Sequence, residues 1–242
     1  MRAQAARRRE NLALASGILV LALALGPWFD ALADRSFAWH MLQHVAIMLV
    51  AAPLLLLGAP LRRVLAALPA ATARRIGRML HAPFLRVLGS PLVAWLSFAI
   101  VLYATHFTAL YEAALEHPPV HAFEHGLYLV AGLAFWNPIL AVPPSPNALT
   151  FPARIFYVFM TMPIAGFLAL AIYTASHPMY PYYAARLGPT AALADQTYGG
   201  EIMWLGGGAA LFVALMWLGG QWLRDEERRA LLYDRQVWTE PR

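Results

Sequence analysis

Six long apolar segments constrain the fold more than any other feature of this sequence. Each is about 20 residues long, the length that an α-helix needs to cross the hydrocarbon core of a bilayer. In lipid the backbone must satisfy its own polar groups, so such segments fold as helices. We therefore predict an all-α, polytopic membrane bundle of six transmembrane helices. The predicted spans cover residues 11–29, 39–58, 90–110, 119–141, 151–175 and 199–223.

Composition agrees with a membrane protein. Hydrophobic residues make up 60% of the chain and charged residues 13%, whereas soluble domains carry about 25% charged residues. The chain has no cysteine, which excludes disulfides and thiolate ligands.

The arginines predict how the spans are oriented. All 18 basic residues are arginine, and all but Arg35 and Arg186 lie at the ends of spans that would face one side. Basic residues accumulate on the cytoplasmic side of membrane proteins. We therefore predict one membrane domain over 1–242 with both termini cytoplasmic, a basic cytoplasmic loop at 59–89 and a cytoplasmic tail at 224–242. The same distribution explains the net charge of +5 without a nucleic-acid partner.

Two segments have alternative interpretations. The basic N-terminus, its short apolar run and Ala31-Leu32-Ala33 resemble a cleavable secretory signal; we expect this segment to be retained as the first span. We expect 59–89 to be a solvated basic loop. The alternative is a short amphipathic helix on the membrane surface within LPAATARRIGRML, residues 68–80.

Histidines gather at the predicted outer ends of three spans. HMLQH places His40 and His44 one helical turn apart on one face, and HAFEH does the same for His121 and His125. His106 lies near the outer end of the third span. Ionisable residues inside a span face the bundle interior and mark function, and neutral imidazole is the commonest metal ligand. These five histidines therefore predict a metal site about one turn inside the outer boundary.

We expect His44, His106 and His125 to be the direct ligands, with His40 and His121 as a second site nearer the surface. Other outer residues are candidates for orienting partners or alternative ligands; they are Glu124, Asp195, Met41, Met203 and Glu201. Histidine with nearby methionine suits copper, although ligand type alone leaves zinc open. Outer aromatic residues are interpreted mainly as a membrane-interface belt; they are Trp39, Tyr103, Tyr111, Tyr180, Tyr182 and Tyr183. Glycines near the start of the sixth span predict close approach to its neighbours.

Enzymatic alternatives share these residues. HAFEH matches H-x-x-E-H, in which two histidines bind zinc and the glutamate is a general base, with Glu201 as a possible third ligand. Paired histidine boxes also occur in multi-histidine iron oxidases, and paired histidines can hold haem. A purely structural membrane protein is the remaining alternative.

Three blocks of sequence resemble the integral-membrane CtaG-type cytochrome c oxidase assembly proteins. They are HMLQHVAIMLVAAPLLLLGAPLR (40–62), HFTALYEAALEHPPVHAFEHGLYLVAGLAFWNPIL (106–140) and LADQTYGGEIMW (193–204). Together with the connecting segments, the resemblance covers roughly 36–223. His40, His44, His106, His121, Glu124, His125, Asp195 and Met203 occupy the family's motif positions.

The resemblance implies a multi-pass protein of the bacterial plasma membrane that helps to mature a haem–copper cytochrome c oxidase. It implies copper as the bound metal, delivered or held during maturation. An oxidase subunit and the lipid bilayer are the expected partners, with a periplasmic copper chaperone as a further candidate. On this interpretation the protein is an assembly factor and no catalytic turnover is required.

Overall fold

The computed structural model describes residues 2–145 and 147–239, and within them the chain is helical with no strand. Four of the long rods are interrupted or bent. The first is α1 (Arg2–Ala24) followed by α2 (Pro27–Ala33); the second is α3 (Phe37–Val45), η1 (Ala46–Ala51) and α4 (Ala52–Leu57). The third is α8 (Pro91–Phe107) followed by α9 (Ala109–Glu116); the last is α13 (Pro189–Glu201), η2 (Ile202–Gly207) and α14 (Gly208–Thr239).

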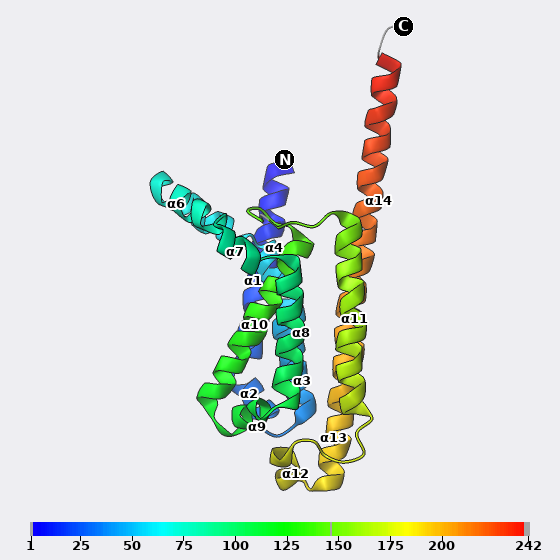
Figure 1. Cartoon of the computed structure of the whole chain (residues 1–242). Coiled ribbons are helices and arrows are strands. Elements are labelled where there is room, and N and C mark those ends of the chain that lie inside the picture. Colours follow the sequence, from blue (N-terminus) through cyan, green and yellow to red (C-terminus); the bar gives the residue numbers. More distant parts are fainter. Residues whose placement is uncertain (1, 146, 240–242) are drawn as a thin grey trace.

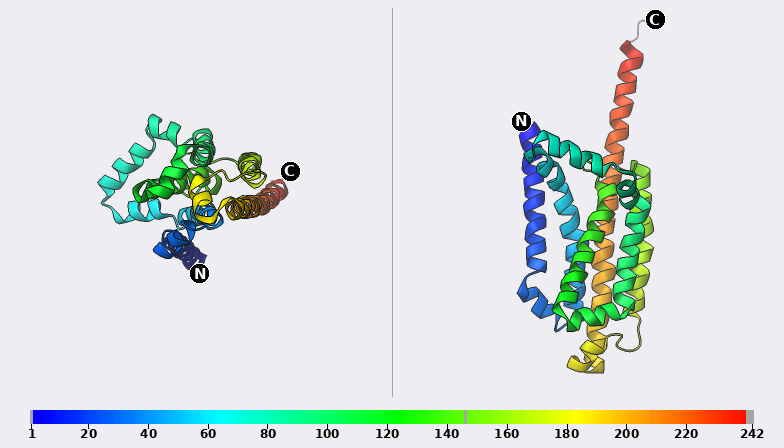
Figure 2. Two further views of the ribbon diagram at one scale, coloured as in Figure 1. Left: turned by 90° about the horizontal axis from the view of Figure 1, so that it is seen from below. Right: turned by 60° about the vertical axis from the view of Figure 1, so that its left-hand side comes forward.

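Two further long helices complete the bundle, α10 (Pro118–Leu140) and α11 (Phe151–Tyr173), and the short helix α12 (Pro181–Leu187) precedes α13. The long helices run side by side (Figure 2). The chain begins and α14 ends at the same end of the bundle, whereas α2, α9 and α12 lie at the opposite end (Figure 1).

The apolar helices are compatible with membrane insertion. Three continuous helical segments are long and apolar enough to cross a bilayer; they cover 37–67, 151–173 and 189–234. Two bent pairs raise the number to five, with bends of 52° between α1 and α2 and 70° between α8 and α9. The predicted fourth span corresponds to α10, which is not among these five candidate membrane-crossing segments. The polar side chains of His121, Glu124 and His125 lower the apolar character of this helix. The six-span count and the cytoplasmic termini stay predictions.

The segment 59–89 differs from the expected solvated loop. It forms three short helices, α5 (Pro60–Ala67), α6 (Ala70–Leu80) and α7 (Pro83–Leu88). The helix of the alternative interpretation is present, because Ala70–Leu80 forms α6 with none of its residues buried; its place on the membrane surface stays a prediction. Prolines at the first helical position of α5 and α7 explain the segmentation, because proline is tolerated there and ends a preceding helix.

The last rod is longer than the predicted sixth span. It begins at Pro189 rather than 199 and is helical as far as Thr239, so the predicted tail is a continuation of α14 up to that residue. Residues 240–242 of the tail lie outside the described part of the chain. Two of the glycines make the predicted close approach: a Cβ at Gly199 would overlap the Phe37 ring, and one at Gly200 would lie 2.9 Å from Tyr173 Cα.

A close contact joins α10 to η1, the segment that directly follows the helix of His40 and His44. The Trp136 indole donates a 3.1 Å hydrogen bond to the Met48 carbonyl oxygen. Gly132, one turn earlier, allows this approach because a Cβ there would lie 2.9 Å from the same oxygen. η1 is a π-helical segment, in which the backbone hydrogen-bond pattern is shifted by one residue. Such segments are frequent at functional sites.

We expect Gly132→Ala to lower the free energy of unfolding by about 1–3 kcal/mol, the usual cost of overpacking a core. Gly126→Ala is the matched control on the same helix, since a Cβ there has open space within 4 Å. The control should stabilise the helix by about 0.5–1 kcal/mol. Thermal unfolding of the detergent-solubilised variants measures both effects. A Gly132→Ala protein as stable as wild type would contradict this account of the packing.

Candidate metal centre

Five histidine side chains from three helices converge near the end of the bundle that holds α2 and α9. His40 and His44 come from α3, His106 from α8, and His121 and His125 from α10. The centroid of the His40 ring lies 4.4 Å from that of His44 and 4.9 Å from that of His121. The centroid of the His44 ring lies 5.7 Å from that of His125 and 6.2 Å from that of His106. Both i, i+4 pairs therefore face the interior of the bundle.

The cluster is buried. His40 is fully buried, and the exposed fractions of His44, His106 and His125 are 4%, 3% and 7%. His121 is only partly buried, so it marks the side of the cluster nearest the surface. Histidines on a membrane-interface belt would keep their polar tips in water, and four of these five do not.

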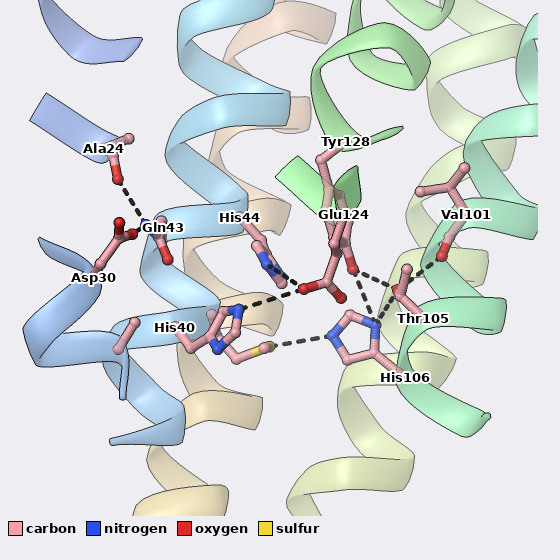
Figure 3. A network of polar contacts seen from close by, with 12 residues as sticks. Ala24, Asp30, His40, Gln43, His44, Val101, Thr105, His106, Glu124 and Tyr128 are labelled. Atoms are coloured by element: carbon pink, nitrogen blue, oxygen red, sulfur yellow. Dashed lines mark hydrogen bonds and ion pairs between the residues drawn. The ribbon is translucent and has the colours of Figure 1, made fainter. Parts of the chain in front are cut away.

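The Glu124 side chain extends from α10 toward the two histidines of α3. Its Oε2 is 3.7 Å from His40 Nε2 and 3.7 Å from His44 Nε2 (Figure 3). These separations are longer than a hydrogen bond, and neither carboxylate oxygen has another partner. The sequence suggested His121 and His125 as partners of Glu124, because the three residues share a helix. The packing of α10 on α3 also brings His40 and His44 close to this carboxylate.

The neutral His40 ring has its proton on Nδ1. The Tyr183 hydroxyl donates a 2.7 Å hydrogen bond to the Ala33 carbonyl oxygen, which uses the only proton that this hydroxyl has. The 3.3 Å contact between His40 Nδ1 and the same hydroxyl therefore has Nδ1 as the donor. His40 Nε2 is left as a lone pair that faces the Glu124 carboxylate.

The interior of the cluster holds buried polar atoms without partners. Within the described part of the chain, several buried nitrogen and oxygen atoms have no hydrogen-bond partner; they are His40 Nε2, both ring nitrogens of His44, His121 Nε2, His125 Nε2 and both oxygens of Glu124. Each unsatisfied buried polar group costs about 1–3 kcal/mol. A cation would satisfy several of them together, because it accepts lone pairs from imidazole and carboxylate alike.

Among the residues that the structure describes, three groups of side chains place their ligand atoms within 4.8 Å of one another. They are His40, His44 and His125; Asp30, His121 and His125; and His40, His121 and Glu124. The first group differs from the expected ligands, because His40 takes the place of His106. The His106 ring is held elsewhere: its Nδ1 is 2.8 Å from the Leu102 carbonyl oxygen and its Nε2 is 3.2 Å from Met41 Sδ.

Asp195, which the sequence offered as an orienting partner or alternative ligand, lies at the start of α3. It accepts hydrogen bonds from the Ser36 hydroxyl at 2.7 Å and from the Phe37 backbone N–H at 2.5 Å. The carboxylate therefore caps the N-terminus of α3, where a negative charge also suits the helix dipole. Asp195 positions the helix that carries His40 and His44, and it is not grouped with the imidazoles.

The remaining candidates divide between the cluster and its surroundings. Met203 lines a cavity together with Met41, His44 and His106. Glu201 ends α13 and is partly buried, and it is absent from the groups of ligand atoms found in the described part of the chain.

The expected aromatic belt is partly an inner layer. Tyr111, Tyr180 and Tyr183 are buried. The Tyr180 ring stacks on Phe37 with centroids 4.7 Å apart, and Tyr111 lies 5.0 Å from the His40 ring. These tyrosines form a wall around the cluster rather than an interface with lipid headgroups.

Gln43 and Asp30 are two site residues that the sequence reasoning missed. The Gln43 amide donates 2.7 Å hydrogen bonds to the Ala24 carbonyl oxygen and to Asp30 Oδ1, which ties the break between α1 and α2 to α3 (Figure 3). Asp30 thereby comes within reach of His121 and His125. Gln43 lies inside HMLQH, so its place in the motif could have marked it as a site residue. Asp30 is a single aspartate after an apolar run, and no sequence pattern connects it with the histidines.

The fold and this cluster define a class: a helical protein with apolar helices of membrane-crossing length and a buried histidine–carboxylate centre. The sequence matches the family model of the cytochrome c oxidase caa3 assembly factors over residues 1–225. The chain belongs to this family, as the three sequence blocks suggested.

The relatives that match are longer proteins. An uncharacterized protein of Mycobacterium bovis and one of Mycobacterium tuberculosis are each 28% identical over 250 residues, which covers 96% of this chain and 38% of the relative. An uncharacterized protein of Mycobacterium leprae is 28% identical over 211 residues, covering 83% of this chain and 32% of the relative. The chain thus spans little more than a third of the length of these relatives. No solved structure matches the chain.

The capping role of Asp195 predicts a change in stability without a loss of metal ligands. Asp195→Ala should lower the free energy of unfolding by about 1–3 kcal/mol, because it leaves charge-assisted hydrogen bonds to α3 unmade. The metal-to-protein ratio of the folded fraction should stay at the wild-type value. Glu227→Ala, at an exposed carboxylate of α14, is the control and should change neither quantity. A loss of metal from folded Asp195→Ala protein would restore this residue as a ligand.

Proposed function

We propose that this protein binds copper at the cluster around Glu124 and delivers or holds it while a haem–copper cytochrome c oxidase matures. The family is an oxidase assembly factor family, which supports association with the oxidase and favours a role other than catalysis. Copper is the cargo in this proposal, and the residues described above are the means of holding it.

The single observation that carries the proposal is the convergence of buried imidazole and carboxylate atoms that have no hydrogen-bond partner in the described part of the chain. His40 Nε2, whose ring proton is on the other nitrogen, faces a carboxylate oxygen 3.7 Å away. Two lone pairs in an apolar interior repel each other and lack water. A bound cation would remove both costs, so the residues present fit a metal ion.

The donor set is suited to copper. His40, His44 and His125 would be the direct nitrogen ligands, since they form the most deeply buried of the three groups. Glu124 would supply the negative charge that a buried cation needs. Imidazole suits copper and zinc alike; thioethers near the cluster favour copper.

The partly buried members of the cluster suggest how the cargo reaches it. His121 and Asp30 are partly exposed and share a group of ligand atoms with His125. They would receive copper from the outer side of the plasma membrane and pass it to the buried group. A periplasmic copper chaperone would supply the metal, and an oxidase subunit in the same bilayer would accept it.

One observation favours an enzyme as the second candidate. Asp30, His121 and His125 bring an acidic third ligand to the two histidines of HAFEH, which is the ligand pattern of a zinc peptidase. The general base of such an enzyme must reach a water molecule on the metal. Glu124 is instead fully buried and faces His40 and His44, so the assembly role is better supported.

Replacing one buried ligand should remove the metal. We expect His44→Ala to reduce the copper content of the purified protein by at least about tenfold, because a site that keeps too few ligands loses affinity steeply. Elemental analysis of protein purified without added metal measures this. His177→Ala is the matched control: this histidine is exposed and contacts the neighbouring Ser176. Equal copper in both variants would refute the proposed site.

Glu124→Gln separates the two candidate functions. The neutral amide should weaken copper binding about 10–100-fold, the usual effect of losing a carboxylate next to metal ligands. Oxidase maturation in cells should fall and be restored in part by excess copper. The wild-type protein should show no peptide hydrolysis. Hydrolysis by wild type that Glu124→Gln abolishes would favour the peptidase instead.

A further inference from the structure

The His106 ring contacts the sulfur atom of a methionine. Its Nε2 lies 3.2 Å from Met41 Sδ, and both side chains are buried. His106 is absent from the groups of ligand atoms around Glu124 found in the described part of the chain. The question is whether the nitrogen donates a proton to the sulfur or presents a lone pair to it.

The surrounding hydrogen bonds answer this. His106 Nδ1 is 2.8 Å from the Leu102 carbonyl oxygen, and because a carbonyl oxygen only accepts, Nδ1 must carry the proton. Thr105 does not compete, since its hydroxyl donates to the Val101 carbonyl oxygen at 2.8 Å. The Tyr128 hydroxyl can donate to Thr105 Oγ1 at 2.5 Å. A neutral imidazole carries one ring proton, so Nε2 presents its lone pair to Met41 Sδ.

The pair borders an apolar cavity of about 40 Å³. Its wall includes Met41, His44, Leu102, His106 and Met203, whereas His40, Glu124 and His125 are not part of it. The cavity therefore borders His44 and His106 but not the carboxylate itself. It lies between the two π-helical segments, since Met48 of η1 and Gly207 of η2 also line it.

We propose that His106 and Met41 form a second copper subsite, selective for the monovalent ion. A nitrogen and a thioether lone pair that face each other at 3.2 Å invite a shared soft cation, and thioether ligands select Cu(I). An apolar wall without a carboxylate disfavours a divalent charge, because a buried charge needs compensation. This inference rests on the proposed function and deepens it: the protein holds copper in two chemically different environments.

The experiment compares a soft and a harder ion on the full chain in detergent. Cu(I) is supplied from a bicinchoninate buffer, and Zn(II) from a fluorescent chelator. Met41→Leu removes the sulfur and roughly conserves volume. Met162→Leu is the control, a partly buried methionine elsewhere in the core. We expect Met41→Leu to weaken Cu(I) binding by about tenfold or more, as the loss of a soft ligand should. Zn(II) binding by this variant, and both affinities of Met162→Leu, should stay at wild type.

Copper-edge X-ray absorption of the wild-type protein loaded with Cu(I) provides a readout that needs no variant, and it should show a sulfur neighbour. A spectrum with nitrogen and oxygen neighbours alone overturns the subsite. So does a Met41→Leu protein with unchanged Cu(I) affinity, or one that loses Cu(I) and Zn(II) equally. If the wild type binds neither ion, the proposed function itself fails; if it binds both and Met41→Leu changes neither, this inference alone fails.

Discussion

Buried imidazole nitrogens and carboxylate oxygens meet between α3 and α10 without hydrogen bonds to one another. His40 Nε2 and the Glu124 oxygens are the clearest case, because the Tyr183 hydroxyl determines on which ring nitrogen the His40 proton lies. Burying such atoms without partners is unfavourable. The surrounding bundle must therefore provide enough packing to hold them together, and a cation is the simplest way to satisfy them.

Much of the polar structure outside the cluster serves to hold the helices that carry it. Asp195 from α13 caps α3, and Gln43 ties α3 to the break after α1. Trp136 binds the η1 carbonyl group next to Gly132. These contacts join segments far apart in the sequence, so the geometry of the cluster depends on the whole bundle. A shift of α3 relative to α10 would separate the two histidine pairs.

The two sides of the cluster differ in chemistry. Nitrogen and oxygen atoms surround Glu124, whereas His106 is paired with the sulfur of Met41 beside an apolar cavity. Under the proposed function the protein would bind copper and release it, and two environments of different softness would offer two states for that metal. The membership of an oxidase assembly factor family gives such a pair of states a use.

The sequence by itself determined the helical class, the apolar rods and the histidine pairs, because helical periodicity places residues four apart on one face. It also indicated close helix approach at Gly199 and Gly200. Only the tertiary structure decided which pairs meet, since this depends on how α10 packs on α3. That packing placed His40 rather than His106 with His44 and His125, turned Asp195 into a helix cap, and brought Asp30 to the cluster. These outcomes rest on contacts between residues up to 159 positions apart, which no local pattern records.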